Sequence, residues 1–152
     1  MNKKRKKPLR HVEEPTAVYQ EADTRSLPET AEKTVARIRS GLPFAEFEAL
    51  RDLLELSSEE LADRLGISRS TLARRKTAGQ LDRDQSDKVL RFARIFGLAK
   101  SVFEGDEAVA LRWMKAPQRA LAYTSPLDFT DTEAGAREVE HLLGRIEHGV
   151  YS

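Results

Sequence analysis

Apolar residues recur at helical spacing from Ser26 onward, and this pattern predicts a series of short amphipathic helices. Ser26 and Glu29 have the spacing of a capping box, and the helix that they predict stops at Gly41. The apolar positions of this first helix are Ala31, Val35 and Ile38. A second helix follows Pro43, and its apolar stripe is most simply a core face formed by Phe44, Phe47, Leu50 and Leu54.

Two further helices are predicted in the middle of the chain. Residues 85 to 98 carry an apolar side, and we expect Gly97 to end that helix. Asp106 is placed to cap the next helix, which Pro117 closes. Trp113, the only tryptophan, lies on this helix, and we expect a buried anchor rather than an exposed binding residue.

The last predicted helix follows the segment SPLDFTDTE, residues 125 to 133, which we interpret as an extended turn. Thr130 and Glu133 match a capping box, and Gly149 occupies the position typical of a helix stop. Two acidic residues of this helix are expected to face solvent, namely Glu138 and Glu140. The apolar face, which indicates a docked helix, consists of Ala136, Val139, Leu143, Ile146 and Val150.

The segment SSEELADRLGISRSTLARRKTAG, residues 57 to 79, has the spacing of a helix-turn-helix. Ser57 begins the first helix with a capping box, and Gly66 can adopt the positive φ that a tight turn needs. Ala62 lets the two helices approach closely, and Leu72 is placed to pack beneath the first helix. This arrangement sets its second helix into the major groove of DNA.

The exposed face of the second helix is polar and basic, and no acidic residue occurs between Arg64 and Leu81. Arginine can bind the O6 and N7 of guanine, while hydroxyls and other cations can contact bases and phosphates. The alternative is a solvated basic helix in a bundle. Arg75 stands where such motifs often carry an apolar packing residue. The candidate DNA-binding residues are Ser68, Arg69, Ser70, Thr71, Arg74, Arg75 and Lys76.

Charge is distributed unevenly, although the net charge is only +1. Residues 1 to 100 contain 21 basic and 16 acidic residues, whereas residues 101 to 152 contain 5 and 9. This asymmetry indicates a polyanion as the partner of the first part and a different partner for the second. Residues 1 to 25 are interpreted as a disordered basic arm, which either tracks phosphates or keeps the protein in solution.

Several classes of protein are disfavoured by what the sequence lacks. No apolar run approaches the roughly 18 residues of a membrane span, and there is no cysteine. The three histidines are not spaced to hold one metal, and no phosphate loop or nucleophile beside a base is present. We therefore expect a cytoplasmic protein that is not an enzyme and has no cofactor, no metal site and no membrane partner.

The chain from about residue 28 to 152 resembles the Xre/MbcA/ParS family of antitoxins. The matching motifs are VLRFARIFGLA at 89 to 99, Gly105-Asp106, Trp113 with Pro117, PLD at 126 to 128, TEAG at 132 to 135, and the ending LLGRIEHGVYS. Gln118 and the pair Phe129-Thr130 depart from the usual pattern and put partner preference in doubt more than the fold. The residue patterns and the resemblance together predict an all-α protein with a disordered arm (1–25), an Xre/Cro-like helix-turn-helix domain (26–84) and a small toxin-binding domain with a C-terminal tail (85–152).

The resemblance also implies a function. Such an antitoxin neutralises a cognate RES-domain toxin that consumes NAD, and its helix-turn-helix binds operator DNA at its own promoter. The alternative is a plain transcriptional regulator whose C-terminal domain only dimerises. One helix-turn-helix contacts few base pairs, so a homodimer on an inverted repeat is expected, with the helices at 28 to 55 or at 106 to 116 as candidate interfaces.

The C-terminal tail is the candidate toxin-binding segment. We hypothesise that it covers the mouth of the toxin's NAD pocket, because a tyrosine ring and a carboxylate can occupy sites built for a dinucleotide. The alternative is that the tail packs on its own domain, with His148 near the helix C-terminus. The residues assigned to this role, mainly through the resemblance, are Arg145, Glu147, His148, Val150, Tyr151 and Ser152.

Overall fold

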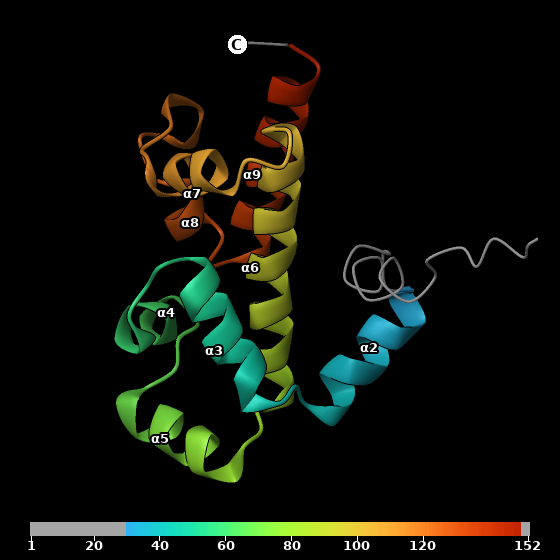
Figure 1. The fold of residues 1–152 in the computed structure, drawn as a ribbon, viewed down its shortest axis with the longest axis vertical. Coiled ribbons are helices and arrows are strands. Elements are labelled where there is room, and N and C mark those ends of the chain that lie inside the picture. Colours follow the sequence, from blue (N-terminus) through green and yellow to red (C-terminus); the bar gives the residue numbers. More distant parts are fainter. Residues whose placement is uncertain (1–29, 150–152) are drawn as a thin grey trace, which may run out of the picture.

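The computed structural model describes residues 30–149, and these residues form helices joined by short loops with two isolated β-bridges (Figure 1). This confirms the all-α fold. The helices are α2 (Ala31–Ser40), α3 (Phe44–Leu53), α4 (Ser58–Arg64), α5 (Arg69–Ala78), α6 (Arg83–Val102), α7 (Glu107–Lys115), the 3-10 helix η1 (Arg119–Leu121), α8 (Pro126–Phe129) and α9 (Glu133–Glu147).

The long helix α6 is the central element of the fold, and it contacts α2, α3, α7 and α9. In Figure 1, α3, α4 and α5 lie around its lower half, whereas α7, α8 and α9 lie around its upper half. Buried side chains from both halves join one hydrophobic core, with Leu61, Phe92 and Leu143 among its members. The candidate DNA-binding helix α5 and the end of α9 therefore lie at opposite ends of one continuous structure.

Helix α6 is longer than predicted, and the expectation that Gly97 ends it was wrong. A capping box formed by Asp82 and Gln85 begins the helix, and it runs through Gly97 to a C-cap at Phe103. Glycine inside a helix costs about 1 kcal/mol, but Phe96 on one side of it is buried and holds the helix in place. The predicted boundary between residues 84 and 85 falls inside this helix, and the division into domains stays a prediction.

The segment before α9 also differs from its predicted form. Residues 126–129 form the short helix α8, and the N-cap of α9 is Thr132 rather than Thr130. Thr130 is buried, and its hydroxyl donates a hydrogen bond of 2.7 Å to the carbonyl of Pro126. The capping box expected of Thr130 and Glu133 was therefore wrong, because the hydroxyl of Thr130 serves the preceding helical turn.

Other expectations for the helix ends are confirmed. Ser57 and Glu60 form a capping box at α4, and Asp106 caps α7.

Two further expectations differ from the structure. Helix α2 begins at Ala31 with Thr30 as its N-cap, so it does not begin at the predicted capping box, which lies outside the described residues. Glu140 was expected to face solvent, but it is half-buried and forms an ion pair with Arg94 of α6.

The predicted core face of α3 is buried, and α7 also buries one face. On α9 the predicted residues Ala136, Val139 and Leu143 are buried, Ile146 is partly buried, and Val150 lies outside the described residues. Leu142 of α9 is an additional buried residue that the predicted stripe did not include. Trp113 is partly buried and packs beside Phe103, with 5.8 Å between the ring centroids. No helix in residues 30–149 has the length and apolar character that a membrane span requires. The buried residues of the three faces include Phe44, Phe47, Leu50, Ala110, Leu111, Met114, Ala136, Val139 and Leu143.

Candidate functional sites

The turn between α4 and α5 has the geometry that the helix-turn-helix spacing predicts. Gly66 has a φ of +67°, a region that favours glycine. The amide of Ile67 donates to the carbonyl of Ala62 at 2.8 Å and closes the turn. Ala62 is buried, and Leu72 packs partly buried against the core beneath α4. Helix α5 is thus attached through the turn and one inward residue.

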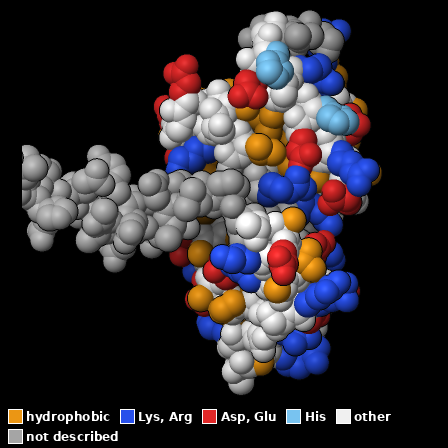
Figure 2. All heavy atoms as spheres, turned by 90° about the vertical axis from the view of Figure 1, so that its right-hand side faces the viewer, with side chains coloured by type: hydrophobic (Ala, Val, Ile, Leu, Met, Phe, Trp, Pro, Cys, Tyr) orange, Lys and Arg blue, Asp and Glu red, His pale blue; other side chains and the backbone are white. Residues whose placement is uncertain are grey.

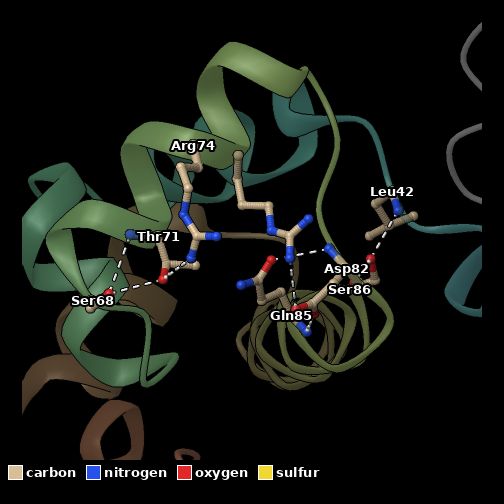
Figure 3. A network of polar contacts seen from close by, with 8 residues as sticks. Leu42, Ser68, Thr71, Arg74, Asp82, Gln85 and Ser86 are labelled. Atoms are coloured by element: carbon tan, nitrogen blue, oxygen red, sulfur yellow. Dashed lines mark hydrogen bonds and ion pairs between the residues drawn. The ribbon is translucent and has the colours of Figure 1, made fainter.

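The outer face of α5 contains a chain of hydrogen bonds that orients one arginine (Figure 3). Ser68 is the N-cap, and its hydroxyl lies 2.9 Å from that of Thr71. Thr71 in turn accepts a hydrogen bond of 3.1 Å from the guanidinium of Arg74. Arg74 is exposed, so its side chain is held in one direction while its remaining donors face solvent. A preoriented guanidinium suits bidentate recognition of a guanine.

Three further candidate residues, Arg69, Ser70 and Lys76, are exposed on the same helix. Arg69 forms an ion pair of 2.8 Å with Glu59 of α4, but its side chain is 85% exposed. Such a surface pair contributes little to stability, so DNA phosphate can replace Glu59 as its partner. Lys76 has no ion pair with any residue between 30 and 149. The face therefore presents cations and hydroxyls together.

Arg75 differs from Arg69 and Arg74 because it is half-buried and forms its ion pair with the start of α6. Its guanidinium lies 3.3 Å from the carboxylate of Asp82, the N-cap of α6. The amide of Gln85 donates to the other oxygen of Asp82 at 2.7 Å. Asp82 thus links the C-terminal part of α5 to the start of α6 (Figure 3). A direct DNA contact by Arg75 stays a prediction.

Asp82 was missed by the sequence reasoning, although the spacing of Asp82 and Gln85 is itself a capping-box signature. The loop around it is fixed further by backbone contacts with the segment before α3. Leu81 donates to the carbonyl of Leu42 at 2.8 Å, and Phe44 donates to the carbonyl of Gly79 at 2.9 Å. These contacts fix the C-terminal end of α5 relative to α3 and α6.

The second candidate site lies at the end of α9. Arg145 is half-buried, and it has no carboxylate partner among residues 30–149. Glu147 and the C-cap residue His148 are exposed, and Gly149 follows with a φ of +69°, as predicted for the helix stop. Three of the predicted toxin-binding residues lie outside the described part of the chain, namely Val150, Tyr151 and Ser152.

Local hydrogen bonds displace the pKa values of two groups, Glu60 and Arg51. The backbone N–H of Ser57 donates to the carboxylate of Glu60 at 2.7 Å and lowers the pKa of that group. A hydrogen bond to Asp52 raises the pKa of Arg51. In the described range, no group of three or more His, Asp or Glu residues is arranged to hold a metal ion.

Comparisons with known proteins match both halves of the chain. Residues 34–94 match the family of antitoxin Xre-like helix-turn-helix domains. Residues 98–149 match the family of antitoxin Xre/MbcA/ParS C-terminal toxin-binding domains. The change between the two matches falls inside α6.

Curated relatives agree with these matches. Antitoxin Xre of Photorhabdus laumondii is 35% identical over 77% of this chain and 80% of its own length. Antitoxin Xre of Yersinia enterocolitica is 34% identical over 78% of this chain and 80% of its own length. Antitoxin Xre of Pseudomonas putida is 33% identical over 43% of this chain and 41% of its own length. With a helix-turn-helix at one end and a toxin-binding domain at the other, the chain belongs to the Xre family of antitoxins.

Proposed function

We propose that this protein neutralises a cognate RES-domain toxin that consumes NAD, and that it binds its own promoter to regulate the operon. The observation that carries the proposal is the separation of two chemically different surfaces. The cationic face of α5 lies at one end of the molecule, and the end of α9 lies at the other (Figure 1). One protein molecule can therefore contact DNA and a toxin without the two partners competing for one surface.

The proposed toxin contact is the segment from Arg145 to Ser152. Arg145 supports this role because its guanidinium has no carboxylate partner among residues 30–149 and can pair with an acidic group at a pocket rim. The exposed positions of Glu147 and His148 place the end of the helix in solvent. The tyrosine ring of Tyr151 matches the stacking groups of a dinucleotide.

The test is co-expression of the tagged full chain with the protein encoded by the adjacent reading frame. A stable complex in which NAD consumption is suppressed is the expected result. Deleting Val150 to Ser152 should restore NAD consumption while DNA binding is retained. A neighbouring protein that does not bind, or one that binds without any NAD-consuming activity, would contradict the RES assignment.

The proposed DNA contact consists of the exposed face of α5, from Ser68 to Lys76. If each subunit of a dimer neutralises three or four phosphates, the slope of log K against log[salt] should be about −5 to −7. The measurement is a fluorescence anisotropy titration of promoter DNA at several salt concentrations. A flat dependence on salt would contradict phosphate binding by this face.

A homodimer is part of the proposal, and the structure favours α2 over α7 as its interface. Three apolar residues of α7, namely Ala110, Leu111 and Met114, are already buried in the chain's own core. Helix α2 buries none of its residues, and Val35 is 42% exposed. Helix α2 contacts α6 within the chain but buries none of its ten residues, so a second copy of the chain would add tertiary packing that stabilises it.

The surroundings of α2 fit a second copy. A groove of about 450 Å³ between α2, α6 and the start of α9 includes Ile38, Leu90 and Ala93 in its lining. Figure 2 views the molecule from the side on which α2 projects, and hydrophobic side chains are visible there among charged ones. Acidic residues of the groove, such as Asp87, can face the basic residues of α2 in the other copy.

The dimer interface can be tested with two matched substitutions. Val35→Glu should convert the dimer to a monomer in size exclusion with light scattering, because it places a charge in the proposed interface. Leu98→Glu is the control, since Leu98 is also 42% exposed but lies outside α2. A dimer that survives Val35→Glu would exclude this interface.

A further inference from the structure

The loop between α7 and α8 contains a tight turn whose backbone is unusual for the residues in it. Ala122 and Tyr123 have φ values of +52° and +62°, and the amide of Thr124 donates to the carbonyl of Leu121 at 3.0 Å. Two central residues with positive φ define a type I′ turn. Asn-Gly, Asp-Gly or Gly-Gly normally occupies these positions because other residues are strained there.

The turn is held firmly from both sides. Leu121 is only 3% exposed and anchors the turn in the core. The backbone of Gln118 donates to the carbonyl of Thr124 at 3.1 Å, and the Gln118 side chain donates to the carbonyls of Trp113 and Ala116. Gln118, one of the departures from the family pattern, therefore fixes the base of the loop to the end of α7.

The side chain at the tip gains no burial from this strained backbone. Tyr123 is 71% exposed, the largest exposure among the large hydrophobic residues in the described range. A strained backbone that is enforced by its surroundings and displays an aromatic ring to solvent is typical of a functional site, because the exposed ring gains little within the protein from this conformation. A rigid tyrosine is also a preferred anchor at protein interfaces, since little side-chain entropy is lost on binding.

The position of the turn identifies the partner class. The turn lies within residues 98–149, which match a toxin-binding domain, and η1 beside it contacts α9. In Figure 1 the loop between α7 and α8 lies at the same end of the molecule as the end of α9. Arg119 of η1 is exposed and has no ion pair among residues 30–149, so a cation accompanies the ring.

We propose that the turn between α7 and α8 displays a second toxin contact, in which the side chain of Tyr123 inserts into an apolar cleft on the toxin surface and Arg119 pairs with an acidic residue beside it. This contact is separate from the C-terminal segment and rests on the proposed function. The two proposed contacts have different roles. The C-terminal segment covers the toxin's NAD pocket, and the turn fixes the orientation of the toxin on the antitoxin.

Two substitutions in the turn distinguish the effect of backbone strain on stability from the contribution of the tyrosine ring to toxin binding. Ala122→Gly keeps the ring but relieves the positive φ, so the midpoint of thermal unfolding should rise by about 2–4 °C with affinity for the toxin within about threefold of wild type. Tyr123→Asn keeps a residue that tolerates positive φ but removes the ring. It should weaken toxin binding by at least about tenfold without lowering the unfolding midpoint.

The binding assay uses the purified full chain and the protein from the adjacent reading frame, with oligomeric state measured in parallel. If Tyr123→Asn binds the toxin with wild-type affinity, the proposed contact at the turn is wrong. It is also wrong if the substitution changes dimerisation and leaves toxin binding unchanged. The variant lacking Val150 to Ser152 is the reference. If that deletion restores NAD consumption while Tyr123→Asn binds normally, only the turn contact fails; a wild-type chain that does not bind overturns both proposals.

Discussion

Helices α5 and α9 carry the two candidate surfaces, and they are held in the protein in opposite ways. Helix α5 buries none of its residues fully and is held by the turn at Gly66, the partly buried Leu72 and the contact between Arg75 and Asp82. Helix α9 buries a whole face, namely Gly135, Ala136, Val139, Leu142 and Leu143. The difference indicates that substitutions on α5 change recognition, whereas substitutions on the inner face of α9 change the fold.

The largest effect is expected at Gly135 of α9. A Cβ atom there would lie 1.7 Å from the carbonyl oxygen of Phe129, so the backbone of α8 or α9 would have to move. Gly135→Ala should lower the free energy of unfolding by about 3 kcal/mol or more. Gly144→Ala is the control in the same helix, because a Cβ meets nothing within 4 Å there and the variant should gain about 0.5–1 kcal/mol. Equal stabilities in urea denaturation would contradict the close approach.

The next effect concerns Arg74 of α5, where binding should change and stability should not. Arg74→Ala should weaken operator binding by about 1–3 kcal/mol and relax specificity at one base pair. The thermal unfolding midpoint should stay at its wild-type value, because Arg74 is exposed. Binding assays with operator variants measure both results. A loss of affinity that is uniform across sequences would indicate a phosphate contact instead of base recognition.

A smaller effect is expected where α5 meets α6. Asp82→Ala removes the N-cap of α6 and the partner of Arg75, and the cap alone should be worth about 1 kcal/mol of unfolding free energy. Operator affinity should fall less than in Arg74→Ala, since the recognition residues themselves remain. Asp84→Ala, in the first turn of the same helix, provides the control. An unchanged urea midpoint in Asp82→Ala would show that the ends of α5 are held by other contacts.

The smallest effect is a dependence of stability on pH at Glu60. The hydrogen bond from the Ser57 backbone lowers the pKa of Glu60 below its ordinary value of about 4.5. A lowered pKa in the folded state means that the group stabilises the fold above the unfolded-state pKa. That contribution is lost as the pH falls through the lower folded-state pKa. The free energy of unfolding should therefore fall less between pH 6 and pH 3 in Glu60→Gln than in the wild-type protein. Chemical denaturation of both proteins at a series of pH values measures this difference.

The sequence predicted the helix-turn-helix well because its signals are local. The box at Ser57 and Glu60, the turn at Gly66 and the polar face of α5 depend on residues within one or two helical turns. The end of α6 could not be predicted in the same way. Gly97 is a sequence signal for a stop, but the burial of Phe96 and Ala99 against other helices keeps α6 continuous.

The start of α9 shows a second limit of local signals. Thr130 with Glu133 and Thr132 with Gly135 both place a threonine three residues before a possible partner. Only the formation of α8 decides between them, because it supplies the Pro126 carbonyl that binds the hydroxyl of Thr130. The role of Gly135 in the TEAG motif likewise depends on the approach of α8, which no local pattern contains.

The candidate sites show the same difference between local signals, which could be predicted, and contacts between separate helices, which could not. All seven predicted DNA-binding residues lie on α5 or at its cap, because helical periodicity places them together. The engagement of Arg75 by Asp82 and the partnership of Glu140 with Arg94 were not predicted, since each joins different helices. The turn at Tyr123 was not predicted either, because Ala-Tyr carries no sequence signal for positive φ.

The unbroken course of α6 has a consequence for how a promoter would be occupied. A helix of 20 residues is about 30 Å long, and the elements that carry the two candidate surfaces are packed along it. Under the proposed function, a toxin bound at the end of α9 would keep a fixed angular position around the DNA axis, set by the base pairs that α5 contacts. Two operators separated by whole helical turns would align their toxins on one side of the duplex, and a spacing changed by about 5 base pairs would turn them to opposite sides.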